Sequence, residues 1–263
     1  MTQAIAQDGQ VLLETQGLVK RYGGRTVVDH VSFTVAPGEI VGLLGRNGAG
    51  KTTSFRMTIG MIDPNSGRVF FRGEEVTRLP MYKRAQRGMG YLSQEPSVFQ
   101  RLTVEQNLLA ILETIKTYGG RERRQRAEGL MKQFGIHDLR DQYARTLSGG
   151  ERRKLEIARA MVTSPMLMLL DEPFSGVDPI AVEELQREIR RLRQEHGIAI
   201  LLTDHNVRET LSVTDRSYII FEGRVLKQGT PRELINDPIV RKTYLGSTFR
   251  GDEFDREHQA AAD

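Results

Sequence analysis

The sequence of 263 residues contains no cysteine and no long apolar run. Without cysteine the chain has no disulfide framework, no thiolate nucleophile and no cysteine-based metal site. Its longest apolar runs, 40–44 and 166–170, are far shorter than the roughly 20 residues that a membrane-spanning helix needs. Residues 1–7 lack the basic segment and apolar core of a signal peptide. These absences predict a protein of the cytoplasm that reaches a membrane only through partners.

A large charge excess is also missing. The chain has 38 basic and 34 acidic residues, a net charge of +4. Its arginine-rich stretches, 121–124 and 187–191, alternate with acids, which is typical of solvated helix faces. A nucleic-acid binder usually concentrates basic residues on one face, so no direct nucleic-acid partner is expected.

The order of the hydrophobic patterns predicts an α/β fold. Residues 11–35 alternate as strands do, around a Gly23-Gly24 turn, and 69–76 is strand-like again. Helical periodicity dominates from about 100 to 163, and strands and helices alternate on either side of it. We therefore expect a mostly parallel sheet covered on both faces, an antiparallel β subdomain and a helical subdomain inserted at about 100–163. The predicted domain is 11–246, between a loose tail at 1–10 and an acidic, disordered tail at 247–263.

A glycine-rich turn between a predicted strand, 40–44, and a predicted helix, 51–59, carries the first chemical motif. Residues 45–52 read Gly-Arg-Asn-Gly-Ala-Gly-Lys-Thr and fit the P-loop pattern in its required context. Such a loop points backbone N–H groups into one concavity at a helix N-terminus, where they bind phosphate. Lys51 would reach the β- and γ-phosphates, and the Thr52 hydroxyl would bind Mg²⁺. The residues predicted to bind ATP here are Arg46, Asn47, Gly48, Ala49, Gly50, Lys51, Thr52 and Thr53.

The second motif is an apolar strand, 166–170, that ends in two carboxylates. Asp171 is suited to Mg²⁺, directly or through water. Glu172 is suited to act as the general base that orients water beside the γ-phosphate. Together the two motifs predict a P-loop NTPase with a RecA-like core, with ATP and Mg²⁺ as cofactors.

The third motif, Leu-Ser-Gly-Gly-Glu at 147–151, precedes a helical stretch. Ser148 and Glu151 have the spacing of a capping box, but two glycines at a helix start leave bare N–H groups suited to phosphate. With this segment the chain resembles the nucleotide-binding subunits of ABC transporters, where it is the signature motif. The resemblance implies that two chains sandwich two ATP molecules, and that Ser148, Gly149, Gly150 and Glu151 bind the γ-phosphate held by the other chain.

Further positions match that family in order. Tyr22 matches the aromatic residue that stacks on adenine, although an ordinary strand aromatic is the alternative. By the same resemblance, Gln94 contacts Mg²⁺ and the attacking water, His205 senses the γ-phosphate, and 175–178 crosses the dimer interface. Asp178 also precedes Pro179 as a helix N-cap, so both roles coexist. The resemblance implies catalytic roles for Lys51, Gln94, Glu172 and His205, and Mg²⁺ ligands at Thr52, Gln94 and Asp171.

A single cassette without a membrane span implies two separate transmembrane subunits and attachment to the cytoplasmic face of the inner membrane. Residues 91–104, 174–180, 203–211 and 244–246 resemble the ATPases that power lipopolysaccharide export. Branched-chain amino-acid importer ATPases share much of this core and are the alternative. A soluble ABC ATPase acting on ribosomes or DNA is a different class that also stays open.

Phe99 and Arg101 are candidates for the groove that receives a helix of the membrane partner, because an apolar anchor beside a cation suits such a groove. The alternative interpretation places Phe99 in the core of the helical insert. The chain departs from the export ATPases in its ten-residue lead, its acidic tail and Ser175.

Overall fold

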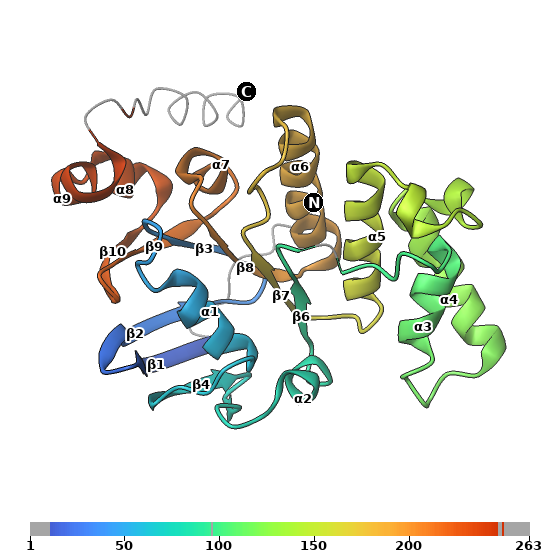
Figure 1. Cartoon of the computed structure of the whole chain (residues 1–263), viewed down its shortest axis with the longest axis horizontal. Coiled ribbons are helices and arrows are strands. Elements are labelled where there is room, and N and C mark those ends of the chain that lie inside the picture. The colour runs from blue at the N-terminus through green and yellow to red at the C-terminus, as the bar shows by residue number, and fades with distance from the viewer. Residues whose placement is uncertain (1–10, 96, 247–248, 250–263) are drawn as a thin grey trace, which may run out of the picture.

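The structure is a computed structural model that describes residues 11–95, 97–246 and 249. The tails expected at 1–10 and, apart from Phe249, at 247–263 lie outside the described residues. Two sheets lie beside each other, and a group of helices forms the opposite end of the molecule (Figure 1).

The larger sheet has the strand order β10-β9-β3-β8-β7-β6. Its strands, in chain order, are β3 Ile40–Leu44, β6 Met89–Leu92, β7 Leu167–Asp171, β8 Ala199–Asp204, β9 Arg216–Phe221 and β10 Arg224–Gly229. Five of them are parallel, and β10 pairs antiparallel with β9 at the edge. Every residue of β3, β7 and β8 is buried, which explains why these strands read as continuous apolar runs.

The smaller sheet is antiparallel and has the order β2-β1-β4-β5. Its strands are β1 Leu13–Tyr22, β2 Arg25–Val35, β4 Ser66–Phe71 and β5 Glu74–Glu75. The stretch 69–76, expected to be strand-like, is divided between β4 and β5. Arg72 and Gly73 have positive φ angles and turn the chain back, so this segment forms a short hairpin.

Helices cover both faces of the larger sheet. Apolar residues of α6 (Pro179–His196) pack with Ile200 and Leu202 of β8, whereas those of α1 (Lys51–Ile59) pack with Leu201 on the other face. The remaining α-helices are α2 Met81–Ala85, α3 Val104–Leu112, α4 Gly120–Gln133, α5 Gly149–Met161, α7 Val207–Leu211, α8 Pro231–Asn236 and α9 Pro238–Val240. Short 3₁₀ helices at His137–Leu139 and Ala144–Thr146 and a π-helical turn at Arg241–Leu245 complete the described elements.

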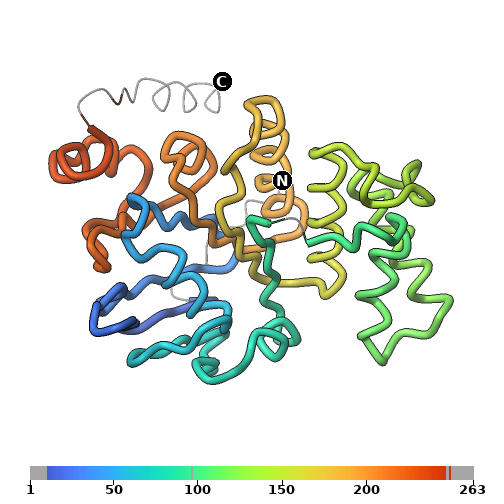
Figure 2. Tube along the Cα trace, in the orientation of Figure 1, coloured from blue at the N-terminus to red at the C-terminus, as the bar shows by residue number. Residues whose placement is uncertain are grey.

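The helices α3, α4 and α5 gather at one end of the molecule, where the sequence predicted a helical subdomain (Figure 2). Capping boxes at Thr103, Ser148 and Thr230 begin α3, α5 and α8, and Asp178 caps α6. Among the described residues, no helix is long and apolar enough to cross a membrane.

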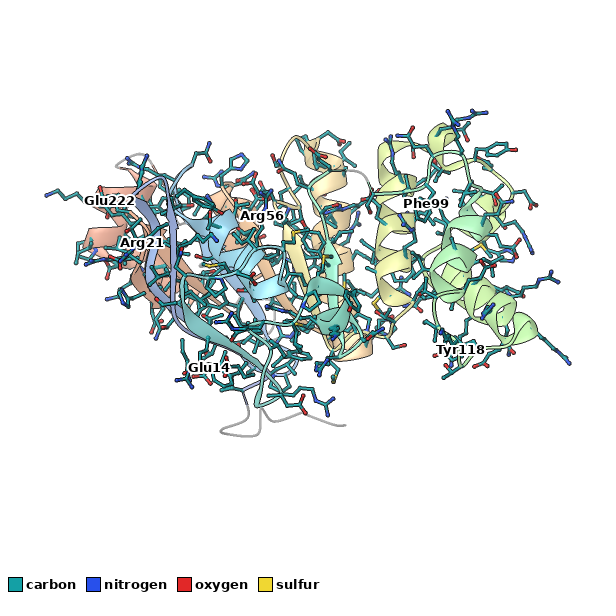
Figure 3. All side chains as sticks on the ribbon, turned by 60° about the horizontal axis from the view of Figure 1, so that its bottom comes forward. Glu14, Arg21, Arg56, Phe99, Tyr118 and Glu222 are labelled. Atoms are coloured by element: carbon teal, nitrogen blue, oxygen red, sulfur yellow. The ribbon has the colours of Figure 1, made fainter. Side chains whose placement is uncertain are left out.

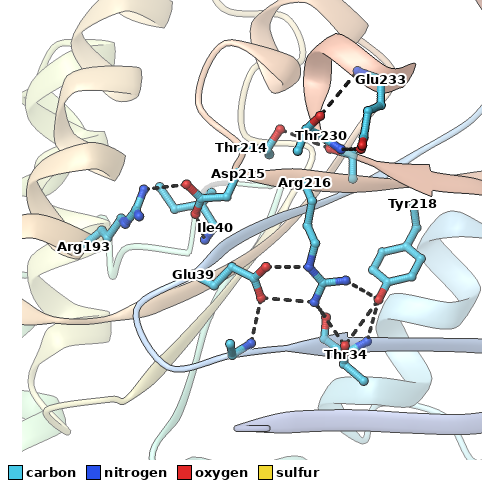
Figure 4. A network of polar contacts seen from close by, with 12 residues as sticks. Thr34, Glu39, Ile40, Arg193, Thr214, Asp215, Arg216, Tyr218, Thr230 and Glu233 are labelled. Atoms are coloured by element: carbon cyan, nitrogen blue, oxygen red, sulfur yellow. Dashed lines mark hydrogen bonds and ion pairs between the residues drawn. The ribbon is translucent and has the colours of Figure 1, made fainter. Parts of the chain in front are cut away.

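A polar network joins the two sheets at the amino ends of the parallel strands (Figure 4). Arg216 at the start of β9 binds Glu39 and also donates to the Thr34 carbonyl of β2 at 2.8 Å. Asp215 beside it accepts from the Ile40 N–H and from Arg193 of α6, both at 2.8 Å. This network fixes the antiparallel sheet and α6 to the larger sheet.

Candidate nucleotide-binding and hydrolysis site

The carboxyl ends of four parallel strands bring the predicted site residues to one edge of the larger sheet. Within the sheet Leu44 pairs with Asp204, Asp171 with Thr203, and Leu92 with Leu170. The P-loop therefore follows β3 beside the carboxylates that end β7 and the segments that follow β8 and β6. In open α/β sheets ligands bind outside this edge.

The P-loop opens toward solvent at its tip and is buried at its base. Arg46, Asn47 and Gly48 are exposed, whereas Ala49, Gly50 and Lys51 are buried. Gly48 and Gly50 have φ angles of +78° and +103°, which L-residues with side chains rarely adopt.

The Lys51 ammonium lies inside the P-loop, where Nζ donates to the carbonyl oxygens of Gly45 at 2.7 Å and Arg46 at 3.2 Å. Burial lowers the pKa of Lys51, and the charges of Glu172, Asp204 and Asp171 oppose that shift. These three carboxylates therefore favour the charged form of Lys51. The arrangement places one buried cation among three acids at the edge of the sheet.

Asp171 is a buried carboxylate with an unused oxygen. Its Oδ1 has no hydrogen-bond partner, and its Oδ2 lies 3.5 Å from the hydroxyl of Tyr91. Burial raises the pKa of this carboxyl. A buried carboxylate oxygen without a partner fits a hard divalent cation. Among the described residues, no group of three or more His, Cys, Asp or Glu side chains could hold a metal ion.

Glu172 has a strained backbone, with a φ angle of +45°, and its N–H donates to the Thr203 carbonyl at 2.7 Å. Non-glycine residues in this region are uncommon and gather at functional sites. The carboxylate Oε2 lies 3.3 Å from His205 Nδ1 and 3.5 Å from Gln94 Nε2. Three residues predicted to be catalytic thus come together at the ends of β6, β7 and β8: Gln94 and His205 both lie beside the same carboxylate oxygen of Glu172.

Asp204 was missed by the sequence analysis. It is fully buried at the end of β8, and its two oxygens accept from the backbone N–H groups of Phe174 and Asn206, both at 2.9 Å. It thereby ties the segment after Glu172 to the segment that carries His205. Burial raises its pKa. The sequence did contain a signal for this residue, because Asp204 directly precedes His205 at the end of an apolar strand.

The signature segment begins α5. Ser148 and Glu151 form the capping box in both directions, so the Glu151 carboxylate is already bound to the Ser148 N–H at 2.8 Å. Gly149 and Gly150 line a pocket of about 350 Å³ together with Gln94, Glu172 and residues 175–178. No residue of 45–53 lines this pocket. The signature glycines thus share a pocket with Glu172, and the P-loop of the same chain does not line that pocket.

The other predicted site residues are exposed at the surface. Tyr22 ends β1 with 50% of its surface exposed. Phe99 is 46% exposed, which is inconsistent with a place in the helical core. The cation over its ring is Arg159, at 4.5 Å from the centroid, and Arg101 is exposed nearby in sequence. Figure 3 shows Phe99 at the end of the molecule that holds α3–α5, away from Arg21 and Glu222.

A P-loop after the first strand of a parallel sheet and adjacent strands ending in acidic residues define the class of P-loop nucleoside triphosphatases. Residues 28–175 match the family model described as ABC transporter. The chain is 52% identical over 239 residues, 91% of its length and 98% of the relative, to the lipopolysaccharide export system ATP-binding protein LptB of Acidithiobacillus ferridurans. It is 49% identical over 238 residues to the protein of that name from Escherichia coli strain K12, covering 90% of this chain and 98% of the relative.

Solved structures agree. An ATP-binding cassette of an ABC transporter, solved in its ADP conformation, superposes on this chain with a TM-score of 0.81 at 26% sequence identity. The superposition covers 91% of this chain and 100% of the solved one. The protein cbiO1 of Clostridium perfringens, part of the ABC transporter complex cbiONQ, gives 0.79 at 27% identity over 95% of this chain and 100% of its own. The chain belongs to the family of ABC transporter ATP-binding proteins and is an ATPase of that family.

Proposed function

We propose that this chain is the ATPase subunit of a lipopolysaccharide export transporter. The observation that carries the proposal is the identity of about half of all residues, over nearly the whole length of both chains, with relatives named for that system. In this proposal two copies of the chain act with two transmembrane subunits at the cytoplasmic face of the inner membrane.

The geometry supports distinct roles for the site residues. Residues 46–53 hold the ATP phosphates through backbone N–H groups, with Lys51 as the buried cation. Asp171, whose Oδ1 has no hydrogen-bond partner, would hold Mg²⁺ together with the Thr52 hydroxyl and Gln94. When bound, Mg²⁺ neutralises charge on the phosphates. Tyr22, exposed at the end of β1, offers a ring for adenine.

Glu172 holds and orients the attacking water, because it follows β7 at the carboxyl edge of the sheet and lines the pocket there. His205 and Gln94 keep that carboxylate in place through contacts of 3.3 and 3.5 Å. General-base residues of this kind contribute about 10²–10⁴-fold to a rate. Lys51 stabilises the negative charge that develops on the phosphoryl oxygens, whereas the N–H groups at the N-terminus of α1 bind the phosphates throughout the reaction.

The signature glycines line a pocket that excludes their own P-loop, which supports the proposal that they bind ATP held by a second copy of the chain. The N-terminus of α5 presents them beside residues 175–178, and none of its own P-loop lies in that pocket. ATP that bridges two copies would favour a closed dimer, and hydrolysis would release it. Phe99, exposed beside the helical subdomain, would pass this movement to a helix of the membrane partner.

A pull-down tests the proposal. The tagged Glu172→Gln chain, expected to trap the ATP-bound dimer, is purified from solubilised membranes with ATP, and its partners are identified by mass spectrometry. A matched Phe99→Ala variant is expected to keep the dimer and lose the membrane partners. The partners are then reconstituted in vesicles containing lipopolysaccharide, with ATP-dependent extraction of that lipid as the readout.

Membrane subunits that extract lipopolysaccharide support the proposal. Permeases recovered with an amino-acid-binding protein would assign the chain to an importer instead. Recovery of ribosomal or DNA-associated partners without membrane proteins would assign it to a soluble ABC ATPase.

A further inference from the structure

Two hairpins of this chain close through two-residue turns of the same backbone shape. Arg72 and Gly73, between β4 and β5, have φ angles of +56° and +78°. Glu222 and Gly223, between β9 and β10, have φ angles of +48° and +79°. Positive φ at both turn residues matches the twist of antiparallel strands and favours glycine. The local requirement for glycine is therefore the same at both turns.

The surroundings of the two glycines differ. Gly73 is exposed, and a Cβ atom added there would meet nothing within 4 Å. Gly223 is buried, and a Cβ atom added there would lie 2.7 Å from the Val27 carbonyl oxygen of β2. A Cβ atom at Gly50 of the P-loop would meet the same oxygen at 2.7 Å. Three backbone segments thus meet where no side chain fits.

Hydrogen bonds join these segments. The Gly223 N–H donates to the Ala49 carbonyl at 3.0 Å, and the Gly223 carbonyl accepts from the Asp29 N–H of β2 at 2.8 Å. A trans peptide unit points its carbonyl and its N–H in opposite directions. Because the Ala49 carbonyl faces the turn, the Gly50 N–H points away from it. The turn thereby sets the direction of one backbone donor of the phosphate loop.

An ion pair fastens the turn to β2. The Arg224 guanidinium contacts Asp29 Oδ2 at 2.6 and 2.7 Å, and His30 Nδ1 lies 2.7 Å from Asp29 Oδ1. The pKa of Asp29 is lowered, first by the hydrogen bond from Arg224 and then by that from His30. Strand β2 pairs with β1, where Tyr22 lies opposite Arg25. Figure 3 shows Glu222 and Arg21 at the same end of the molecule.

We propose that Gly223 is a positioning residue for the phosphate loop, and that the β9–β10 turn holds the Gly50 N–H in the direction that ATP phosphate requires. The contact also joins the strand pair that carries Tyr22 to the phosphate loop, so the adenine and phosphate ends of the site keep a fixed separation. The inference rests on the nucleotide site proposed above.

The test compares Gly223→Ala with Gly73→Ala in the full chain. Both variants place alanine at the same positive φ, so they share the local strain, and only Gly223→Ala displaces the turn from Val27. The Kd for a fluorescent ATP analogue is expected to rise about tenfold in Gly223→Ala, the loss of one charge-assisted hydrogen bond, and to stay within about twofold in Gly73→Ala. Equal Kd values in the two variants would overturn the inference.

Kinetics separate positioning from general damage. A donor to phosphate acts in the ground state and the transition state alike, so Gly223→Ala should raise KM about tenfold and leave kcat within about threefold. A fall in kcat with unchanged KM would contradict the proposed role.

Arg224→Gln provides a second variant that adds no atoms at the contact and keeps the test informative if Gly223→Ala fails to fold. It should raise the Kd about threefold, because the turn keeps its backbone bonds and loses only the ion pair to Asp29. An unchanged Kd in Arg224→Gln would then overturn the inference.

Lys51→Ala, measured in parallel, tests the site itself. If Lys51→Ala keeps full affinity, the proposed nucleotide site fails. If Lys51→Ala loses binding while the two glycine variants bind alike, only the role of Gly223 fails.

Discussion

The two edges of the larger sheet differ in whether their buried polar groups all have hydrogen-bond partners. At the amino edge Glu39 uses both oxygens: Arg216 contacts each of them, and the Ala36 N–H donates to Oε2 at 2.7 Å. Asp215 is paired in the same way with Arg193 and the Ile40 N–H. At the carboxyl edge Asp171 Oδ1 and Thr203 Oγ1 are buried without a hydrogen-bond partner.

This difference separates stability from function. Satisfied polar groups at the amino edge stabilise the junction between the two sheets, because breaking them would leave buried groups unpaired. Unsatisfied groups and the positive φ of Glu172 at the carboxyl edge cost stability and leave atoms free for a ligand. Substitutions at the two edges should therefore have opposite profiles of activity and stability.

The largest expected effect is on turnover at the carboxyl edge. Glu172→Gln should lower kcat about 10³-fold, because the amide cannot take a proton from water, while ATP binding is retained. The measurement is steady-state ATP hydrolysis together with the Kd for ATP. Glu39→Gln makes the same chemical change at the amino edge and should keep kcat within about twofold. Fast hydrolysis by Glu172→Gln would contradict the assigned role.

The largest effect on stability belongs to the amino edge. Arg216→Met should lower the free energy of unfolding by about 2 kcal/mol, since Glu39 and the Thr34 carbonyl lose their donor in a partly buried site. Urea unfolding measures the change, and kcat of the folded variant should stay within about twofold. The double variant with Glu39→Gln should recover part of the loss. If Arg216→Met left the free energy of unfolding unchanged, the proposed role of the amino edge in stability would be wrong.

Neutralising one acid at each edge should change stability in opposite directions. Asp171→Asn should raise the free energy of unfolding by about 1 kcal/mol, because it removes a charge that burial disfavours by more than the nearby Arg56 favours it. Asp215→Asn should lower it by about 1 kcal/mol, because it weakens the bonds to Arg193 and Ile40. Both are measured by urea unfolding without nucleotide or metal. A lower free energy of unfolding in Asp171→Asn would contradict the interpretation that the Asp171 carboxylate destabilises the fold in the absence of a ligand.

The smallest effects concern two helices with the same cap. Ser148→Ala and Thr103→Ala each remove the N-cap of a capping box and should each lower stability by about 1 kcal/mol. Only Ser148→Ala should reduce ATP hydrolysis, since α5 alone carries the signature glycines. Melting temperature and hydrolysis rate are compared for the pair. Equal rates in the two variants would restrict Ser148 to capping.

The sequence predicted the motifs well where local chemistry defines them. The P-loop at 45–52, the acids that end β7 and the helix caps depend on residues a few positions apart, and the structure places them as expected. The strand-like stretch at 69–76 forms two strands and not one, because Arg72 and Gly73 turn the chain. Asp204 was missed since one of its two backbone partners, Phe174, lies 30 residues away in the chain. The roles of the site residues stay predictions.

By itself the sequence determined the class of fold, the glycine-rich P-loop and the two acids at the end of β7, because hydrophobic period, glycine spacing and caps act within a few residues. Only the tertiary structure decided that His205 and Gln94 both lie beside one oxygen of Glu172, that Arg159 rather than Arg101 covers Phe99, and that the Gly223 N–H donates to the P-loop. Such contacts depend on strand order and register, which bring together residues far apart in the chain, so no local pattern contains them.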